Sequence, residues 1–424
     1  MSNAIERCRI CGNPELEPVI DLGSQALTGI FPRSAAQEVS IGKLELVRCG
    51  GRADACGLVQ LRHSCDPALM YGSNYGYRSG LNPSMVEHLS ELASDATART
   101  PLRPGDLVLD IGSNDGTLLR KLASPGVTLT GMDPSADKFR QFYPAEAAAI
   151  CDLFSAGRFQ REYGSRKAKI VTSIAMFYDM ESPLQFMREV AEVLADDGIW
   201  VFEQSYLPAM IESDSFDTIC HEHLEYYALA QIQFMTDRSG LKILDVSFDK
   251  TNGGSFRVTT AHANGNSAGG DKASAILRRE EAGGYREAAV YSQFRDRVRR
   301  HKEEIPRYLR EAKRQGQKVF GYGASTKGNV VLQYCGITSE EIPFIADVNP
   351  DKFGCFTPKS LIPIISEEEA KAQQPDAFFV FPWHFREFIV AKERNFLARG
   401  GRLIFALPVL EAVDATPDSE GATE

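Results

Sequence analysis

The stretch VLDIGSNDGTLL, residues 108–119, decides the fold of this chain. It begins as a continuous apolar run, which is typical of a strand in a parallel sheet whose faces are both covered. A turn crowded with glycine and short polar residues follows, before the chain becomes apolar again. Glycines let the backbone approach a ligand closely, and a helix N-terminus offers free amide donors. The stretch therefore predicts a strand, a ligand-binding turn and a helix.

The segments around it continue this alternation. Strands are predicted at DLVLDIG, VTLTGMD, KIVTSIAM and GIWVFEQS, with helices between them and a further helix over residues 83–97. Residues 206–265 read as loop-rich, and 276–315 as a polar helical region. From residue 318 the alternation resumes in a shorter form. The fold class is α/β, with a central doubly wound, Rossmann-like parallel sheet and a second, smaller Rossmann-like unit.

A chain of 424 residues exceeds one core and predicts several domains. We expect a small cysteine-rich domain at residues 1–75, the central domain at 76–305, the second α/β domain at 306–415 and a disordered tail at 416–424.

Composition excludes several classes of function. A net charge of −10 argues against a nucleic-acid partner, because phosphate contacts need clustered Lys and Arg. The sequence has no apolar run of the roughly eighteen residues that a membrane span needs, and no signal peptide is evident at its start. We therefore expect a cytoplasmic protein, in which nine cysteines do not form a disulfide framework.

The turn after the first central strand has the pattern D-x-G-x-x-x-G and lacks the Lys-Ser/Thr of a phosphate-binding loop. An acidic residue at the strand end suits a ligand that carries an ammonium group. About twenty residues on, Asp133 ends the next strand, where a carboxylate can accept both ribose hydroxyls. Asp152 is placed to approach an adenine. The alternative is a Rossmann turn of structural use only. We predict S-adenosylmethionine bound by Asp110, Gly112, Asn114, Asp115, Gly116, Asp133 and Asp152.

Two cysteine pairs near the N-terminus predict a metal site. Cys8 and Cys11 are separated by two residues, and Cys49 and Cys56 by six. Four thiolates suit a tetrahedral structural zinc ion, although the second spacing is wider than the common two to four. Cys65 is a candidate substitute for one ligand, and reduced buried cysteines are the alternative.

The third motif is His221-Glu222-His223, which we call the HEH triplet. Such groups are seldom fully buried unless they are paired. The triplet could supply a general base, two ligands of a catalytic metal, or a hydrogen-bonded loop anchor. Further along, GYGASTKGN at 321–329 could cradle a phosphate at a helix terminus through Gly321, Gly323, Ser325, Thr326 and Lys327, or could be a tight strand–helix junction.

In this order the motifs resemble the sugar C-methyltransferases of deoxysugar biosynthesis, of the tetronitrose 3-C-methyltransferase type. The resemblance spans nearly the whole chain. It is carried by CRICG (8–12), CGLVQL (56–61), YGSNYGYRSG (71–80), LDIGSNDG (109–116), EQSY (203–206), HEHLEYY (221–227), GGSFRV (253–258), GYGASTKGN (321–329) and DVNPDKFG (347–354).

The resemblance implies a zinc-binding N-terminal domain, a central S-adenosylmethionine domain and a C-terminal Rossmann-like domain that together bind a nucleotide-linked 4-keto sugar. A base removes the proton next to the ketone, and the enolate takes the methyl group. Matched by motif, His223 is the base, with Glu222 and His221 beside it and Tyr75 or Tyr77 in the catalytic site. Substrate contacts are expected from Tyr71, Cys220, Ser325, Lys327 and Asn329.

Two positions depart from the family pattern. Cys220 stands where the family has a catalytic tyrosine, and Phe177 or Tyr178 stands where it has a histidine. A thiol is a weak donor to an enolate oxygen. The leading hypothesis is a C-methyltransferase that acts, as a monomer or homodimer, on a nucleotide-linked sugar. The alternatives are an O-methyltransferase on a sugar or small metabolite, and a non-enzymatic zinc-containing binding module.

Overall fold

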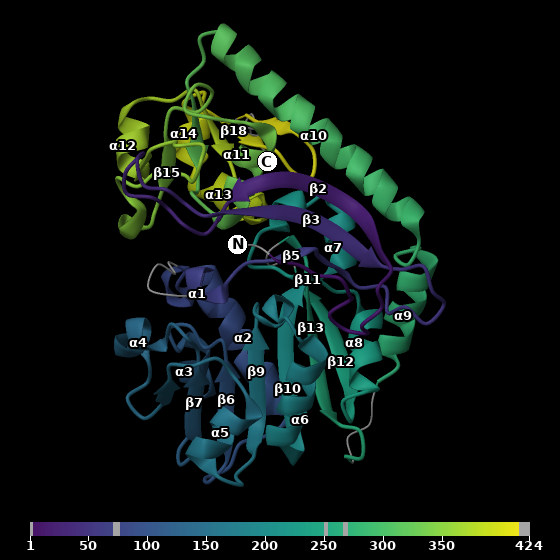
Figure 1. Ribbon diagram of the computed structural model, residues 1–424. Helices are drawn as coiled ribbons and strands as arrows, with labels where there is room; N and C mark the ends of the chain where they lie inside the picture. Colours follow the sequence, from purple (N-terminus) through teal and green to yellow (C-terminus); the bar gives the residue numbers. More distant parts are fainter. Residues whose placement is uncertain (1–2, 71–76, 250–252, 266–269, 415–424) are drawn as a thin grey trace, which may run out of the picture.

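The computed structural model describes residues 3–70, 77–249, 253–265 and 270–414 of the chain. The predicted disordered tail and two of the predicted site tyrosines, Tyr71 and Tyr75, lie outside the described residues. Three sheets dominate the structure. The central sheet lies at one end, a curved ribbon from the N-terminal region crosses the middle, and the C-terminal sheet lies at the other end (Figure 1).

The central sheet has seven strands in the order β12-β13-β10-β9-β6-β7-β8. Its parallel part consists of β6 (Leu107–Ile111), β7 (Thr128–Met132), β8 (Ala148–Ile150), β9 (Ala168–Ile174) and β10 (Leu194–Ser205). Helices α2 (Pro83–Arg99), α3 (Thr117–Leu122), α5 (Ala156–Tyr163) and α6 (Pro183–Val193) belong to this unit. The doubly wound order confirms the predicted Rossmann-like fold and the helix expected over residues 83–97.

Two antiparallel strands complete this sheet, β12 (Leu241–Asp249) and β13 (Ser255–His262). The expectation that residues 206–265 are loop-rich was therefore wrong. Both strands are fixed by pairing, β13 with β10 and β12 with β13, and the stretch also contains α7 (Leu207–Glu212) and α8 (Leu229–Thr236). Pairing between distant segments leaves little mark on local sequence.

The N-terminal region folds into a four-stranded sheet of order β11-β4-β3-β2, which we call the N-terminal ribbon. Three strands are local: β2 (Leu16–Ala26), β3 (Ile41–Cys49) and β4 (Val59–Leu61). The fourth, β11 (Glu225–Tyr226), comes from the segment directly after the HEH triplet and pairs antiparallel with β4. A two-stranded pair, β1 (Asn3–Ala4) with β5 (His63–Ser64), lies beside it. The triplet is thus attached to the N-terminal sheet by its own backbone.

The C-terminal sheet has the order β16-β15-β14-β17-β18-β19. Its parallel strands are β14 (Val319–Tyr322), β15 (Ile345–Asp347), β16 (Ile364–Ser366), β17 (Ala377–Val380) and β18 (Arg402–Phe405), and β19 (Glu411–Val413) is antiparallel. Helices α11 (Thr326–Cys335), α12 (Glu367–Ala372), α13 (Arg386–Lys392) and α14 (Arg394–Ala398) accompany it. This order also reverses direction at its first strand, as in other Rossmann-like sheets.

The predicted polar helical region forms α9 (Lys272–Ala282) and the long helix α10 (Ala288–Arg314), which runs along one side of the molecule toward the C-terminal sheet (Figure 1). One apolar cluster joins the N-terminal ribbon, α10 and the C-terminal sheet, including Leu44, Val298 and Val330. The core of the N-terminal ribbon is therefore continuous with that of the C-terminal sheet, and a second cluster, which includes Ile10 and Leu109, joins the N-terminal region to the central sheet. No helix within the described ranges has both the length and the apolarity to cross a bilayer.

Candidate active site

The four predicted zinc ligands come together at one end of the N-terminal ribbon. Cys8, Cys11, Cys49 and Cys56 place their Sγ atoms within 4.8 Å of one another, and three of the four side chains are buried. Four thiolates around one point fit a structural zinc ion. Cys65 lies elsewhere, against Gly42 and His221, so it does not substitute for a ligand.

The predicted cofactor turn is built around Asp133 at the end of β7. Its carboxylate accepts a hydrogen bond from the backbone amide of Asn114 at 2.9 Å and another from the amide of Ser135 at 2.7 Å. Gly112 and Asn114 both adopt positive φ angles, 73° and 50°. A Cβ at Gly112 would lie 2.9 Å from Cγ of Met176, which follows β9. The turn is therefore held open by a left-handed glycine and by the carboxylate of the neighbouring strand.

Asp110 is buried at the end of β6, where Thr172 donates a hydrogen bond of 2.7 Å to its carboxylate. Burial raises its pKa to about 7, and the hydrogen bond from Thr172 opposes this shift. A cationic ligand beside this carboxyl group would favour its charged form, so the binding of a cation and the deprotonation of Asp110 are coupled. Gly116 adopts φ 71° and directly precedes α3.

Two predicted cofactor residues also bind the chain itself. The side-chain oxygen of Asn114 accepts from the amide of Ser79 at 3.0 Å, and Asp115 accepts from the amide of Gly80 at 2.9 Å. Asn114 also donates to the carbonyl of Tyr77 at 3.1 Å. The segment that carries Tyr77 therefore rests on the cofactor turn, and the side chain of Tyr77 is 49% exposed beside it.

The structure places the last predicted cofactor residue, Asp152, on the surface after β8. Its carboxylate pairs with Arg158 at 3.3 Å, and the next residue, Leu153, exposes 56% of its surface. An exposed leucine beside an exposed carboxylate offers both an apolar face and an acceptor to a base such as adenine.

In the HEH triplet, His223 has the geometry of a base. Its Nδ1 donates to the carbonyl of Thr218 at 2.9 Å, so its Nε2 carries the free lone pair. Burial, reinforced by the ammonium group of Lys327, lowers the pKa of His223 to about 4. The imidazole is therefore neutral at pH 7. The centroid of its ring lies 4.4 Å from that of the Tyr178 ring.

The other two members of the triplet face the N-terminal ribbon. His221 is 1% exposed and donates from Nε2 to the carbonyl of Gly42 at 3.2 Å. Burial lowers its pKa to about 4. Glu222 accepts a long hydrogen bond of 3.5 Å from the hydroxyl of Thr28, and burial raises the pKa of its carboxyl group. The structure therefore turns His221 into the protein interior, while Glu222 lies near Thr326 and His223 near Lys327, both at the start of α11.

The structure shows the surroundings of the two positions that depart from the family pattern, Phe177 or Tyr178 and Cys220. Phe177 is fully buried and stacks on Tyr227 in the core, whereas Tyr178 contacts His223. Cys220 is also fully buried, and burial raises the pKa of its thiol well above the usual value. Tyr178, and not Phe177, is thus the residue beside the candidate base.

The second glycine-rich turn, after β14, lies close to the triplet. Lys327 is near enough to lower the pKa of both His223 and His384 through its charge, and α11 packs against the short helix η4 (Phe216–Thr218). Ser325 caps α11 by accepting from the amide of Gly328 at 3.0 Å. Asn329 is buried and donates to the carbonyl of Thr28 at 2.7 Å. Of the predicted substrate residues here, Lys327 lies near His223, and Asn329 is linked to Glu222 through Thr28.

Three residues of this region were missing from the sequence prediction. Asp217 is 1% exposed, accepts from Nε1 of Trp383 at 2.9 Å and has a second carboxylate oxygen without a partner among the described residues. His384 has a buried Nδ1 that finds no hydrogen-bond partner within the described part of the chain. Trp383 and His384 could have been predicted from the sequence, because they closely follow an apolar strand and ligand-binding residues gather at the carboxyl ends of parallel strands.

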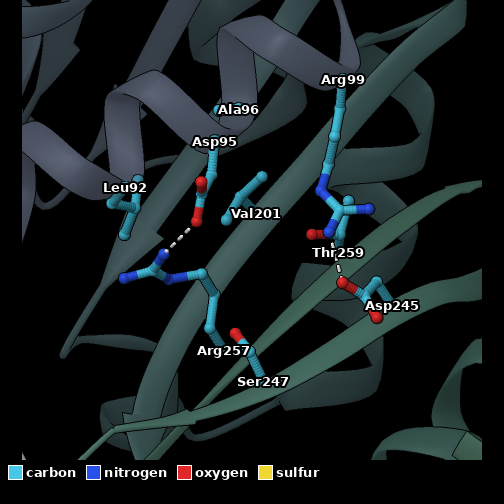
Figure 2. Close-up of a pocket in the computed structure, with 9 residues that line it drawn as sticks. All are labelled: Leu92, Asp95, Ala96, Arg99, Val201, Asp245, Ser247, Arg257 and Thr259. Atoms are coloured by element: carbon cyan, nitrogen blue, oxygen red, sulfur yellow. Dashed lines mark hydrogen bonds and ion pairs between the residues drawn. The ribbon is translucent and has the colours of Figure 1, made fainter. Parts of the chain in front are cut away.

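A cavity between α2 and strands β12 and β13 is not part of this site. It holds about 10 Å³, room for one water molecule at most, and two ion pairs close it: Arg257 with Asp95, and Arg99 with Asp245 (Figure 2). Arg257 also binds Glu203 at 2.9 Å, and Glu203 in turn pairs with His88. This network ties α2 to the central sheet.

Three family models match the chain. They describe a zinc-binding domain at residues 8–71, a methyltransferase domain at 85–246 and a C-methyltransferase C-terminal domain at 250–408. The C-methyltransferase NovU of Streptomyces niveus is 30% identical over 415 residues, which cover 97% of both chains.

Two solved methyltransferase structures are similar to part of the chain. The CcbJ methyltransferase of Streptomyces caelestis is 17% identical, with 42% of this chain and 90% of that chain covered and a TM-score of 0.33. The plantazolicin methyltransferase BpumL, in a complex with S-adenosylhomocysteine (SAH), is 13% identical, with 43% and 87% covered and a TM-score of 0.35.

Proposed function

Because this chain belongs to the C-methyltransferase family that contains NovU, and is an S-adenosylmethionine-dependent methyltransferase with a structural zinc site, we propose that it methylates the carbon beside the ketone of a nucleotide-linked keto sugar. The observation that carries the proposal is the state of His223. Because Nδ1 is bound to the carbonyl of Thr218 and the imidazole is neutral at pH 7, Nε2 is free to accept a proton from the carbon next to a ketone.

In this mechanism Nε2 of His223 removes the proton. The electron pair of the broken C–H bond is delocalised onto the ketone oxygen, which gives an enolate. When bound, S-adenosylmethionine would supply an electrophilic methyl group to the deprotonated carbon and would leave as S-adenosylhomocysteine, which keeps the electron pair of the broken S–C bond. Asp133 would hold the ribose hydroxyls, Asp152 the adenine and Asp110 the positively charged end of the cofactor.

The nucleotide part of the substrate is assigned to the C-terminal sheet. The order of its strands reverses between β14 and β17, and ligands of open α/β sheets bind at such a switch point. Gly323 packs directly on Pro382 there, with φ 83°, and Lys327, Trp383 and His384 lie beside it. This supports a diphosphate at Lys327.

O-methylation of a sugar hydroxyl is the second candidate, and Cys220 favours it. A fully buried thiol in place of a phenol removes the neutral donor that an enolate oxygen would use. His223 could deprotonate a hydroxyl equally well.

Proton exchange separates the two reactions. In heavy water, without S-adenosylmethionine, C-methylation predicts enzyme-dependent deuterium uptake at the carbon next to the ketone for at least one member of a panel of nucleotide 4-keto sugars. Mass spectrometry with labelled methyl donor then identifies the methylated atom. Methyl transfer to a hydroxyl without any exchange would replace the proposal by O-methylation.

His223→Ala should lower both exchange and turnover about 10²–10⁴-fold, the usual contribution of a positioned base, while the affinity for S-adenosylmethionine stays unchanged. The matched control is His262→Gln, at the opposite end of β13 from the site. Equal loss of turnover and cofactor affinity in His223→Ala would contradict the assignment of His223 as the base.

A further inference from the structure

The HEH triplet is bound to the zinc-binding domain as well as to the domain in which it lies in the sequence. Strand β11, which begins two residues after His223, is the fourth strand of the zinc-binding domain's sheet. Just before it, the carbonyl of Leu224 accepts from the amide of Leu61 at 2.8 Å. The backbone of the triplet therefore follows any movement of that sheet.

Two glycines of the zinc-binding domain leave the space that two triplet side chains occupy. A Cβ at Gly42 would lie 2.7 Å from Cδ2 of His221. A Cβ at Gly29 would overlap Oε1 of Glu222, and the hydroxyl of Thr326 is the next nearest group, at 3.7 Å. Real Cβ atoms are essentially never found at such separations, so a side chain at Gly29 would displace the Glu222 carboxylate.

The loop that contains Gly29 cannot move away. The hydroxyl of Thr28 donates to Glu222, and the carbonyl of Thr28 accepts from Asn329 of α11 at 2.7 Å. Two residues earlier, the amide and carbonyl of Ala26 both bond to the side chain of Gln333, at 2.8 and 3.1 Å. The loop is thus clamped between the C-terminal domain and the triplet, and Thr28 is fully buried.

We propose that Gly29 and Thr28 position the carboxylate of Glu222 beside the substrate, so that the zinc-binding domain forms one wall of the active site. The proposal rests on the proposed function in one respect, namely that Glu222 faces the reacting sugar. Thr28 and Gly29 are positioning residues: they contact Glu222, and Glu222 contacts the substrate.

The decisive variant is Gly29→Ala. The backbone at Gly29 has an ordinary φ, so the added methyl group acts by displacing the flexible end of Glu222. We expect kcat to fall about 100-fold, because a displacement of about 1 Å can have that effect, with an unchanged KM for S-adenosylmethionine. Gly157→Ala is the matched control, since a Cβ there meets open space and φ is also ordinary.

A double-mutant cycle tests whether Gly29 acts through Glu222. Glu222→Asp shortens the side chain and makes room, so Gly29→Ala should reduce kcat much less in the Glu222→Asp background than in the parent. An equal reduction in both backgrounds would overturn the proposal. Thr28→Val removes the hydroxyl without adding volume and should lower kcat less than Gly29→Ala, and Thr28→Ser should restore the activity. A Thr28→Val protein as active as the parent would remove Thr28 from the proposal.

The same cycle can be measured as melting temperatures, without substrate. Gly29→Ala should lower Tm in the parent and much less in Glu222→Ala. If the parent turns over no keto sugar but the two Tm effects are coupled, the proposed function fails and the positioning of Glu222 by Gly29 stands. If the parent turns over a keto sugar but the two Tm effects are additive, the proposed function stands and the positioning of Glu222 by Gly29 is wrong.

Discussion

The turn after β6 and the turn after β14 share one frame but carry opposite charges. In each, a glycine with a left-handed backbone packs on a residue two positions after a strand. Gly112 packs on Met176, which comes after β9, and Gly323 packs on Pro382, which comes after β17. In each, an aspartate at the end of the second strand accepts an amide from the turn. Asp133 accepts from Asn114 at 2.9 Å, and Asp347 accepts from Ala324 at 2.7 Å.

The charged side chains differ. The first turn has the buried carboxyl group of Asp110 and is separated from α3 by Gly116, which offers no side-chain cap. The second has Lys327 in the first turn of α11, whose N-terminus Ser325 already caps. A carboxylate favours a sulfonium or ammonium ligand, and a lysine at a helix N-terminus favours a phosphate. One backbone design therefore serves two ligands of opposite charge.

Of the variants that test this difference in charge, the one that removes the charge of the second turn should change a ligand's binding free energy most. Lys327→Gln should weaken the binding of a nucleoside diphosphate such as dTDP by about 1.5–3 kcal/mol, the usual range for a hydrogen bond to a charged group. Titration calorimetry at two salt concentrations measures it, and the salt dependence of the affinity should shrink as well.

The affinity of Lys327→Gln for S-adenosylmethionine should equal that of the parent. Lys313→Gln, on the exposed end of α10, serves as the control for a lysine lost elsewhere. An unchanged affinity for dTDP would show that the second turn is a structural junction, as the sequence also allowed.

The two aspartates make a matched pair of variants with smaller effects. Asp133 and Asp347 are 8% and 7% exposed, and each accepts two backbone amides. Asp133→Asn should weaken S-adenosylmethionine by about 1–3 kcal/mol and leave dTDP unaffected. Asp347→Asn should do the reverse.

Calorimetry of both variants with both ligands gives the four values needed. If each variant weakens both ligands equally, the aspartates support only the fold. Asp347 differs in one respect, because the ammonium group of Lys352 lies 3.9 Å from its carboxylate. That neighbour should make the Asp347 effect the smaller of the two.

The first turn was predictable from sequence and the surroundings of the second were not. A buried strand, a glycine-rich turn and an acidic residue about twenty positions on are local patterns, and the cysteine pairs are also local. Asp217, Trp383 and His384 meet only because η4 and the end of β17 lie against α11. Likewise, β11 pairs with β4 across more than 160 residues, and no periodicity records that contact.

The smallest effect concerns the titration of Asp110. Burial raises the pKa of this carboxyl group to about 7, so about half of the unliganded protein carries it protonated at neutral pH. A cationic ligand favours the ionised form, and binding must therefore release a proton below pH 7. At about 1.4 kcal/mol per pH unit, the affinity for S-adenosylmethionine should fall toward tenfold for each unit below 7 and level off above it.

Calorimetry between pH 5.5 and 8.5 in buffers of different ionisation enthalpy would measure both the affinity and the released proton. In Asp110→Asn the affinity should be lower at pH 8 and should no longer change between pH 6 and 7. A slope that the variant shares with the parent would belong to the ligand's own amino group. The terminal phosphate of dTDP itself loses a proton at about pH 6, so the binding of dTDP should gain affinity up to about pH 7 in the parent and in Asp110→Asn alike. A pH dependence of S-adenosylmethionine binding that Asp110→Asn removes, beside a pH dependence of dTDP binding that it leaves intact, would confirm that the two turns bind ligands of opposite charge.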